Sequence, residues 1–426
     1  MSIFQNQREL LDIDGEATGR SHVLDILEAG ILSVLPEKAV GDAFATKVLK
    51  LPDEFTVLGW GKASLGMFSA FKNNYQGEIL GGHIISLPEE EKSPPESKIG
   101  ISSGAHPLPD ETSLDSGRKL LAIAEELKEK DTLVCLISGG GSSMFEVPKE
   151  NTELENLRDA YKLLLESGAD IHEMNSVRRA LSSSKGGGLA RVAYPAKVIN
   201  IVISDVPGNN LEDIASGATV EDPFRIKPQD VVKKYDLEEK LDGHTLENIE
   251  SYRPIEKKYF RNVKTHIIAD NDRAQEAMLK RARSLGYKAT RFGGYLHGEA
   301  RLAVKAFMET EGELIVGGGE TTVTVKGGGR GGRNQEFVLA GLQKIKRGIL
   351  ASCGTDGIDG TTKAAGAIGD KTVLETARAR RYDMGTFLEN NDSYGFFKDC
   401  GGLLITGPTG TNVADISVFL GEVASS

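Results

Sequence analysis

The feature that most constrains this chain is a repeated order of a short, mostly apolar segment followed by residues rich in glycine, serine or aspartate. Such segments occupy residues 55–58, 133–137, 198–203 and 265–269. Apolar strands that alternate with helical stretches indicate a parallel sheet with helices on both faces. The sequence therefore predicts an α/β fold whose N-terminal part holds a Rossmann-like, mostly parallel sheet flanked by helices.

The rest of the chain suggests two domains. A helical apolar face precedes the first strand and is formed by Val23, Ile26, Leu27, Ile31 and Leu35. Residues 222–263 are charged, flanked by prolines and mostly without period, which is typical of a domain boundary, although a peripheral helical insertion would give the same pattern. After Glu313 the pattern becomes β-rich. We expect an N-terminal domain over 1–250 and a smaller α/β domain over 251–426.

Charge and cysteine content exclude several classes of protein. There are 51 Lys and Arg against 62 Asp and Glu, a formal net charge of −11, which argues against binding to nucleic acid or anionic membranes. No apolar run approaches the roughly 20 residues of a membrane helix. The three cysteines form no CxxC pair, which disfavours a disulfide framework or a zinc site. We expect a cytoplasmic protein.

Glycine and serine gather where ligands bind in parallel sheets, beyond the carboxyl ends of the strands. The segment after residues 133–137 consists of Ser138, Gly139, Gly140, Gly141, Ser142 and Ser143. Its backbone N–H groups and hydroxyls could form a cradle for an anion, while the structural alternative is a tight turn between strand and helix.

A second glycine cluster covers residues 317–332, of which eight are glycine. Arg330 and Arg333 add positive charge, and a helix that begins near Asn334 would direct its positive end to the same place. This combination again favours an anion site. A flexible hairpin tip with solvated arginines is the alternative.

Individual polar residues extend the candidate site. Lys62 follows the first strand in Gly-Trp-Gly-Lys, at a good position to neutralise a phosphate, although the spacing does not fit a P-loop. Asn175 and Arg178 lie three apart, on one face of an expected helix. Asp205 directly follows a buried strand, where a carboxylate needs a metal, a cation or a proton. Asp356 lies between glycines, where an ordinary Asx turn is the alternative.

Taken in order, these segments resemble the glycerate 2-kinases, the family with a C-terminal MOFRL domain. The matching strings include Gly-Trp-Gly-Lys-Ala (59–63), Ala-His-Pro-Leu-Pro-Asp (105–110), Ile-Ser-Gly-Gly-Gly-Ser-Ser (137–143), Asn-Ser-Val-Arg-Arg-Ala-Leu-Ser-Ser-Ser-Lys-Gly-Gly (175–187), Ser-Asp-Val-Pro-Gly (204–208), Gly-Gly-Arg-Asn-Gln-Glu (331–336) and Gly-Thr-Asp-Gly-Ile-Asp-Gly (354–360). The resemblance extends from about residue 20 to the end of the chain.

The resemblance implies ATP-dependent phosphorylation of D-glycerate at its 2-hydroxyl, with Mg²⁺, by an enzyme of two α/β domains that close over a cleft. It implies that Lys62 and Arg333 match the family's cleft lysine and arginine. The small molecules D-glycerate and ATP are then the expected partners, with no nucleic acid or membrane, and a homo-oligomer stays open.

Within this resemblance we assign provisional roles. Lys62, Asp205 and Arg333 are the expected catalytic residues. The nucleotide phosphates are assigned to residues 138–143 and Lys185. Substrate binding is assigned to Asn175, Arg178, Glu320 and Asn334. A metal ion is assigned to Asp205 and Asp356, and the sequence does not separate a metal-binding role of Asp205 from that of a base.

Two other functions fit parts of the sequence. An NAD(P)H-dependent hydroxypyruvate reductase would need a true GxGxxG segment after a strand, with an acidic residue about 20 positions further on. The candidates are weak, because Ser64 stands where the third glycine would be after Gly59 and Gly61. A non-catalytic binding protein would not need several charged, glycine-rich loops.

Overall fold

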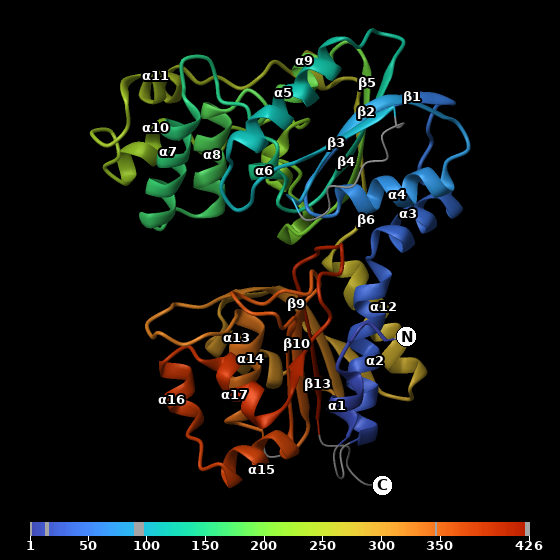
Figure 1. Ribbon diagram of the computed structural model, residues 1–426, viewed down its shortest axis with the longest axis vertical. Helices are drawn as coiled ribbons and strands as arrows, with labels where there is room; N and C mark the ends of the chain where they lie inside the picture. The colour runs from blue at the N-terminus through green and yellow to red at the C-terminus, as the bar shows by residue number, and fades with distance from the viewer. Residues whose placement is uncertain (1, 13–16, 89–97, 346, 422–426) are drawn as a thin grey trace. The chain divides into compact units, whose positions relative to one another are not determined.

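The computed structural model describes residues 2–12, 17–88, 98–345 and 347–421. Its contacts divide the chain into two compact units (Figure 1). The central unit is Ala39–Ile268, and the terminal unit combines Met1–Lys38 with Ala269–Ser426. This division differs from the expected boundary between residues 250 and 251 at both ends, because the N-terminal helices belong to the terminal unit and the central unit continues to Ile268.

The central unit is built on a six-stranded sheet in the order β3-β2-β1-β4-β5-β6. Its strands are β1 (Glu54–Trp60), β2 (Glu78–Ser86), β3 (Ile99–Ser103), β4 (Thr132–Ile137), β5 (Lys197–Ile203) and β6 (Val263–Ala269). The pairs β2–β3, β1–β2, β1–β4 and β4–β5 are parallel. This is the strand order of Rossmann folds, so the prediction of a Rossmann-like, mostly parallel sheet is confirmed.

Helices cover this sheet and form a separate layer beside it (Figure 1). They are α3 (Pro36–Ala45), α4 (Ser64–Asn74), α5 (Glu111–Glu125), α6 (Gly141–Met144), α7 (Leu154–Glu166), α8 (Ile171–Leu181), α9 (Gly188–Ala193), α10 (Pro228–Lys234) and α11 (Gly243–Ser251). Strand residues such as Leu58 and Leu133 are fully buried with Leu120 and Leu189 of the covering helices. This burial explains why the strands read as continuous apolar runs.

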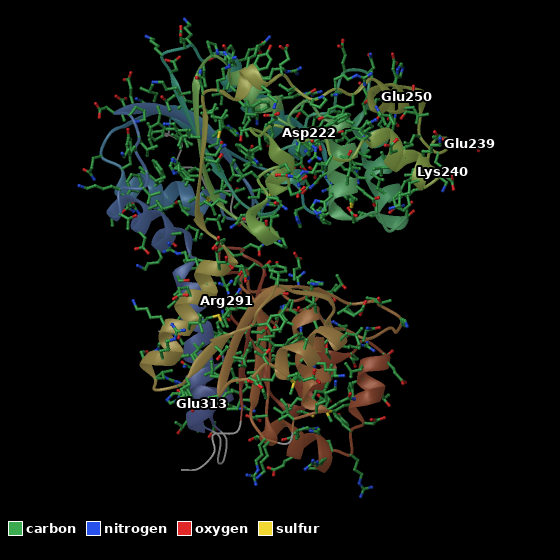
Figure 2. All side chains as sticks on the ribbon, turned by 180° about the vertical axis from the view of Figure 1, so that it is seen from behind. Asp222, Glu239, Lys240, Glu250, Arg291 and Glu313 are labelled. Atoms are coloured by element: carbon green, nitrogen blue, oxygen red, sulfur yellow. The ribbon has the colours of Figure 1, made fainter. Side chains whose placement is uncertain are left out.

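The segment proposed as a domain boundary is a helical insertion in the central unit. Val231 and Ile249 of α10 and α11 share a buried cluster with Tyr161 and Val177 of α7 and α8. Asp222, labelled in Figure 2, accepts a hydrogen bond from Tyr252 at 2.6 Å and pairs with Arg179 at 3.2 Å. The alternative interpretation of residues 222–263, a peripheral insertion, therefore describes this segment.

The terminal unit holds a mixed sheet in the order β12-β11-β10-β13-β9-β7, with β8 also paired to β9. Its strands are β7 (Ala289–Arg291), β8 (Leu296–Glu299), β9 (Leu314–Thr322), β10 (Ile349–Gly354), β11 (Gly366–Gly369), β12 (Leu403–Leu404) and β13 (Asp415–Leu420). Its helices are α1 (Gln7–Leu11), α2 (Ala17–Ser33), α12 (Asn271–Ser284), α13 (Ala300–Met308), α14 (Arg333–Leu342), α15 (Lys371–Ala379), α16 (Met384–Glu389) and α17 (Ser393–Cys400). The predicted α/β character of this part is confirmed.

The N-terminal helices belong to this unit because they pack against it and their side chains form an ion pair and hydrogen bonds with it. α2 and α12 lie together on one side of the sheet, opposite α13 and α14 (Figure 1). Arg20 forms a buried, two-pronged ion pair with Asp370 at 2.5 and 2.9 Å. Thr411 donates to the carbonyl of Val34 at 2.7 Å. These contacts join α2 and the residue after it to the rest of the terminal unit.

Candidate active site

The central unit places several polar loops at one edge of its sheet. Lys62, His106, Ser138 and Asp205 each follow the carboxyl end of a strand, namely β1, β3, β4 and β5. These strands are neighbours or next neighbours and run parallel, so their carboxyl ends share an edge. Ligands of open parallel sheets bind at this edge.

Hydrogen bonds join the loop after β1 to the loop after β4. The Lys62 N–H donates to the Gly139 carbonyl at 2.9 Å, and the Ala63 N–H donates to Ser138 Oγ at 2.9 Å. Gly140 has a left-handed backbone (φ 80°), and a Cβ there would lie 3.1 Å from Lys62 Cγ. The Lys62 side chain therefore lies against this loop.

The glycine- and serine-rich loop offers open donors. Gly141 and Ser143 N–H groups donate to carbonyls within the loop, at 3.3 Å in both cases. In the part of the chain that the structure describes, the N–H groups of Gly139, Gly140 and Ser142 have no acceptor. Adjacent open N–H groups beside a lysine suit an anion, as the sequence predicts.

A hydrogen-bond network runs from this loop to α8. The Ser142 and Ser216 hydroxyls lie 2.7 Å apart, and Ser216 donates to Asn175 Oδ1 at 3.0 Å. Asn175 Nδ2 donates to Asp213 at 3.0 Å, and Arg178 donates to Asn175 Oδ1 at 3.4 Å. This confirms that Asn175 and Arg178 share one helix face. Because Asn175 is only 1% exposed, it holds the loop rather than facing solvent.

Backbone strain occurs in the same network. Ala215 and Ser216 both have left-handed backbones, with φ of 50° and 56°. Such conformations cost about 1 kcal/mol or more for residues other than glycine, and they concentrate where function requires a fixed geometry.

Lys185 does not lie where the sequence prediction requires. The residue is 3% exposed, and its ammonium group donates to Glu146 Oε2 at 2.8 Å and to the Phe145 carbonyl at 3.1 Å. Burial lowers the pKa of Lys185, and the Glu146 carboxylate, which also accepts from Tyr161, opposes this effect. Lys185 is buried, and the carboxylate of Glu146 already balances its charge, so the side chain has a structural role. Direct contact of Lys185 with nucleotide phosphates does not fit this position.

The two carboxylates expected to bind a metal belong to different units. Asp205 follows β5 in the central unit, and Asp356 lies in the terminal unit, where its side chain accepts from the Ile358 N–H at 3.1 Å. The contact between Asp356 and the Ile358 N–H forms the Asx turn that the sequence analysis gave as the alternative to metal binding. Among the described residues, no cluster of three or more His, Cys, Asp or Glu side chains could hold a metal ion. A single carboxylate is still compatible with Mg²⁺, which is usually bound by one or two carboxylates plus substrate phosphates.

In the terminal unit, Arg333 lies between two carboxylates. Its Nε and one terminal nitrogen donate to Asp415 at 2.6 and 3.1 Å, and the other terminal nitrogen donates to Glu320 at 2.7 Å. Burial lowers the pKa of the Arg333 guanidinium, but Asp415 and then Glu320 outweigh this effect, so the pKa is raised overall. Arg333 is thus a permanent cation with part of its surface accessible.

The side chain of Asn334 makes its hydrogen bonds within the protein. It is 2% exposed, its amide donates to Asp359 and Asp415, and it accepts from Ser352 at 2.5 Å. Asp359 also accepts from the N–H groups of Asn334 and Gln335 and so caps the start of α14. Burial raises the pKa of Asp359 to about 6 despite these hydrogen bonds. Direct substrate binding by Asn334 does not fit this burial.

Part of the glycine-rich loop before α14 is closed by hydrogen bonds within the protein. The N–H groups of Lys326 and Gly327 donate to Asn391 Oδ1, and the Gly328 and Gly329 N–H groups donate to Asn390. These four donors are therefore used within the protein. Beside it, a cavity of about 510 Å³ is lined by Arg333 together with Thr321, Thr322, Gly331, Gly332, Gly360 and Thr361 among others.

A larger cavity, of about 600 Å³, lies elsewhere. It is lined by Glu54, Glu78, Thr132 and Lys197, which are the first residues of β1, β2, β4 and β5. This is the amino edge of the parallel sheet, opposite the edge where ligands of such folds bind. Its size therefore does not make it a candidate active site.

No role was assigned from the sequence to four residues that organise the candidate site: Asp213, Ser216, Asp359 and Asp415. Ser216 contacts Ser142, which is 74 residues away, and Asp213 contacts Asn175, which is 38 residues away. Asp415 lies 82 residues from Arg333. A lone aspartate at the start of an apolar strand was the available signal for Asp415, because a carboxylate there needs a partner.

Comparison with known proteins agrees with this architecture. Residues 22–250 match the model of a domain of unknown function, DUF4147, and residues 313–415 match the MOFRL family. A D-glycerate 2-kinase from Thermotoga maritima is 36% identical over 93% of this chain and 97% of its own length. The solved structure of a Thermotoga maritima glycerate kinase has a TM-score of 0.83 at 35% identity and covers 93% of this chain and 98% of its own. A protein from Agrobacterium vitis, whose name proposes a hydroxypyruvate reductase, is 36% identical over 95% of both chains.

The fold and the polar loops at its strand ends define a two-domain α/β protein of the DUF4147–MOFRL type. The chain belongs to the glycerate kinase family, because relatives of that name align with nearly all of it and share its fold.

Proposed function

We propose that this chain is a kinase that transfers the terminal phosphoryl group of ATP to the 2-hydroxyl of D-glycerate, giving 2-phosphoglycerate and ADP. Family membership over both domains supports the reaction class, and the name of the Thermotoga maritima relative supports D-glycerate and the 2-position.

The observation that carries the proposal furthest is the contact of Lys62 with the loop of residues 138–143. A lysine side chain lies against a loop with open N–H groups, at the ligand-binding edge of a parallel sheet. This combination suits a phosphate chain, because lysine supplies charge and the backbone supplies directed donors. We assign residues 138–143 to the nucleotide phosphates and Lys62 to the phosphoryl group in transfer.

The remaining roles follow from charge and exposure. Arg333 binds the glycerate carboxylate, since a guanidinium offers a carboxylate both a permanent positive charge and hydrogen-bond donors. Phosphoryl transfer depends mainly on positioning and charge neutralisation. Asp205 accepts the proton of the substrate hydroxyl or contributes a ligand to Mg²⁺. Arg178 supports substrate binding, and Asn175 holds Arg178 directly and Ser142 through Ser216.

Mg²⁺ is part of the proposal as the ion that accompanies ATP. Asp205 is the residue of the central unit that would hold it. When bound, the ion would neutralise phosphate charge. The residues of the chain would supply the orientation of the substrates and the acceptor for the proton.

A hydroxypyruvate reductase is not favoured, although the Agrobacterium vitis relative bears such a name. Rossmann enzymes that bind NAD hold the ribose with an acidic residue near the end of the second strand. Here β2 ends in Ile84-Ile85-Ser86, and Ser86 is fully buried. The acidic residues 89–91 lie outside the described residues.

None of the helices in the described part of the chain has the length and apolar character of a membrane span. Cys135, Cys353 and Cys400 are buried free thiols, which is compatible with the cytoplasm that we propose as its compartment.

The proposal is tested by measuring ADP release with and without D-glycerate, and by following NADH absorbance with hydroxypyruvate in parallel. We expect ADP release that depends on D-glycerate and no oxidation of NADH. Oxidation of NADH without ADP release would overturn the proposal in favour of the reductase.

A further inference from the structure

The two carboxylates on Arg333 differ in exposure and in how firmly they are held. The Asp415 side chain is 7% exposed, whereas that of Glu320 is 47% exposed. Asp415 contacts two nitrogens of the guanidinium and Glu320 contacts one. The two acids therefore do not play equivalent roles.

Asp415 is fixed by the protein around it. It is the first residue of β13, and its backbone pairs with Gly319 and Gly354 of the neighbouring strands. The amide of Asn334 donates to the same carboxylate at 3.0 Å. A buried, two-pronged ion pair sets the plane of a guanidinium and is costly to break.

Glu320 is held by little besides Arg333. Among the described residues, Arg333 is the one hydrogen-bond or ion-pair partner of its carboxylate. Exposed ion pairs of this kind contribute little stability, because water solvates both charges well. Glu320 can therefore leave Arg333 at small cost.

The charges around Arg333 also favour replacement of Glu320 by the carboxylate of a ligand. One guanidinium between two carboxylates leaves a local net charge of −1, which repels an anionic substrate. Arg333 is one of the residues that line a cavity of about 510 Å³, and its side chain is about one-third exposed. Replacement of Glu320 by another carboxylate keeps the charge and the hydrogen bond to the terminal nitrogen.

We infer that Glu320 is an exchangeable counter-ion, which occupies the accessible edge of Arg333 until the carboxylate of the substrate replaces it, and that Asp415 is a positioning residue that stays bound throughout. This inference rests on the proposed function, in which Arg333 binds glycerate. It revises the earlier assignment of Glu320 as a substrate-binding residue. In this scheme Glu320 protects the site from incidental anions, because a ligand must compete with a carboxylate already present.

The test compares Glu320→Gln, Asp415→Asn and Asp415→Glu with the wild-type protein. Asp272→Asn is the matched control, since Asp272 pairs with an exposed arginine of the same unit, Arg291, which is labelled in Figure 2. For Glu320→Gln we expect the KM for D-glycerate to fall by up to about fivefold, with kcat within about twofold, and inhibition by acetate to strengthen by a similar factor. The control should leave all three values unchanged.

For Asp415→Asn we expect kcat to fall by about tenfold to a hundredfold, because a misplaced guanidinium no longer matches the substrate. Asp415→Glu should restore part of this loss if positioning is the cause. Thermal unfolding of each variant shows whether it is folded. Loss of activity in both Asp415 variants with unchanged unfolding would contradict a pure positioning role.

An unchanged or raised KM in Glu320→Gln would overturn the exchange, and a raised KM would mean that Glu320 accepts a hydrogen bond from the substrate. Calorimetric titration with D-glycerate separates this inference from the proposed function. If the wild-type protein releases no ADP, tighter glycerate binding by Glu320→Gln would still support exchange at Arg333. Equal binding by both proteins, or none, would overturn it.

Discussion

The ammonium group of Lys185 lies 2.8 Å from Glu146 Oε2, and both side chains are almost fully buried. The resemblance to the glycerate 2-kinases led us to expect Lys185 at the nucleotide phosphates, since it stands in a matching segment with serines and glycines. Its ion pair with Glu146, and the hydrogen bond from Tyr161 to the same carboxylate, instead make it part of the interior of the central unit.

Substitution of Lys185 by methionine should therefore act on stability. It leaves a buried carboxylate without its cation, which costs about 3–5 kcal/mol. Thermal and urea unfolding measure the loss, and the double variant Lys185→Met with Glu146→Gln should recover part of it. If Lys185→Met unfolds like the wild-type protein while its KM for ATP rises tenfold, Lys185 contacts the nucleotide after all.

Gly140 and Gly168 provide a matched pair of glycines for testing the Lys62 loop. Both have left-handed backbones, with φ of 80° and 74°. A Cβ at Gly140 would lie 3.1 Å from Lys62 Cγ, whereas a Cβ at Gly168 would meet nothing within 4 Å. Either change to alanine should cost about 1–2 kcal/mol of stability through the backbone.

The two glycine variants should differ in kcat. Gly140→Ala moves the Lys62 side chain and should lower kcat by tenfold or more, on the order of what a displacement of about 1 Å costs. Gly168→Ala should keep normal kcat. Equal activity of the two variants would show that the contact between Gly140 and Lys62 does not matter for the reaction.

His83 should make the central unit sensitive to acid. Burial, with a smaller effect of Lys119, lowers the pKa of His83 to about 4, from an ordinary value of about 6.5. The folded state then binds fewer protons than the unfolded state between these values. Stability is fully present above about pH 6.5 and is lost as the pH falls towards 4, by about 1–3 kcal/mol.

The variant His83→Gln isolates this contribution. Glutamine can keep a hydrogen bond to Ser102, which His83 contacts at 2.7 Å, but it does not titrate. Its melting temperature should fall less than that of the wild-type protein between pH 7 and pH 5. Parallel curves for the two proteins would contradict the assigned pKa of His83.

Replacing Lys62 or Arg333 should lower the rate of the reaction. Removal of a group that stabilises charge in a transition state typically costs about 10²–10³ in rate. Lys62→Ala and Arg333→Ala should each show such a loss in kcat/KM, while Arg291→Ala, which removes another paired arginine of the terminal unit, should not. Near-normal turnover of the first two variants would place the active site elsewhere.

Much of this architecture was accessible from the sequence because it depends on local patterns. The apolar segments around Phe55, Leu133 and Val198 are strands of the parallel sheet, and the polar loops follow them as expected. The helix expected near Asn334 begins at Arg333. Burial on both faces produces continuous apolar runs, and periodicity detects them.

Pairing between distant residues was not accessible in this way. Nothing near Lys185 indicates that Glu146 neutralises it, 39 residues away. The donors of the loop at residues 326–329 are used by Asn390 and Asn391, more than 60 residues further on. The N-terminal helices join the terminal unit through contacts such as that of Arg20 with Asp370, 350 residues apart. Such contacts depend on the three-dimensional fold, which residue spacing does not encode.

Phosphorus NMR of the reaction of D-glycerate with ATP tests the central claim most directly, because one spectrum identifies both the donor and the position of phosphorylation. We predict that ATP signals decline as those of ADP and 2-phosphoglycerate grow in equal amounts. A product phosphorylated at the 3-hydroxyl, or an unchanged ATP spectrum in the presence of D-glycerate, would contradict the account.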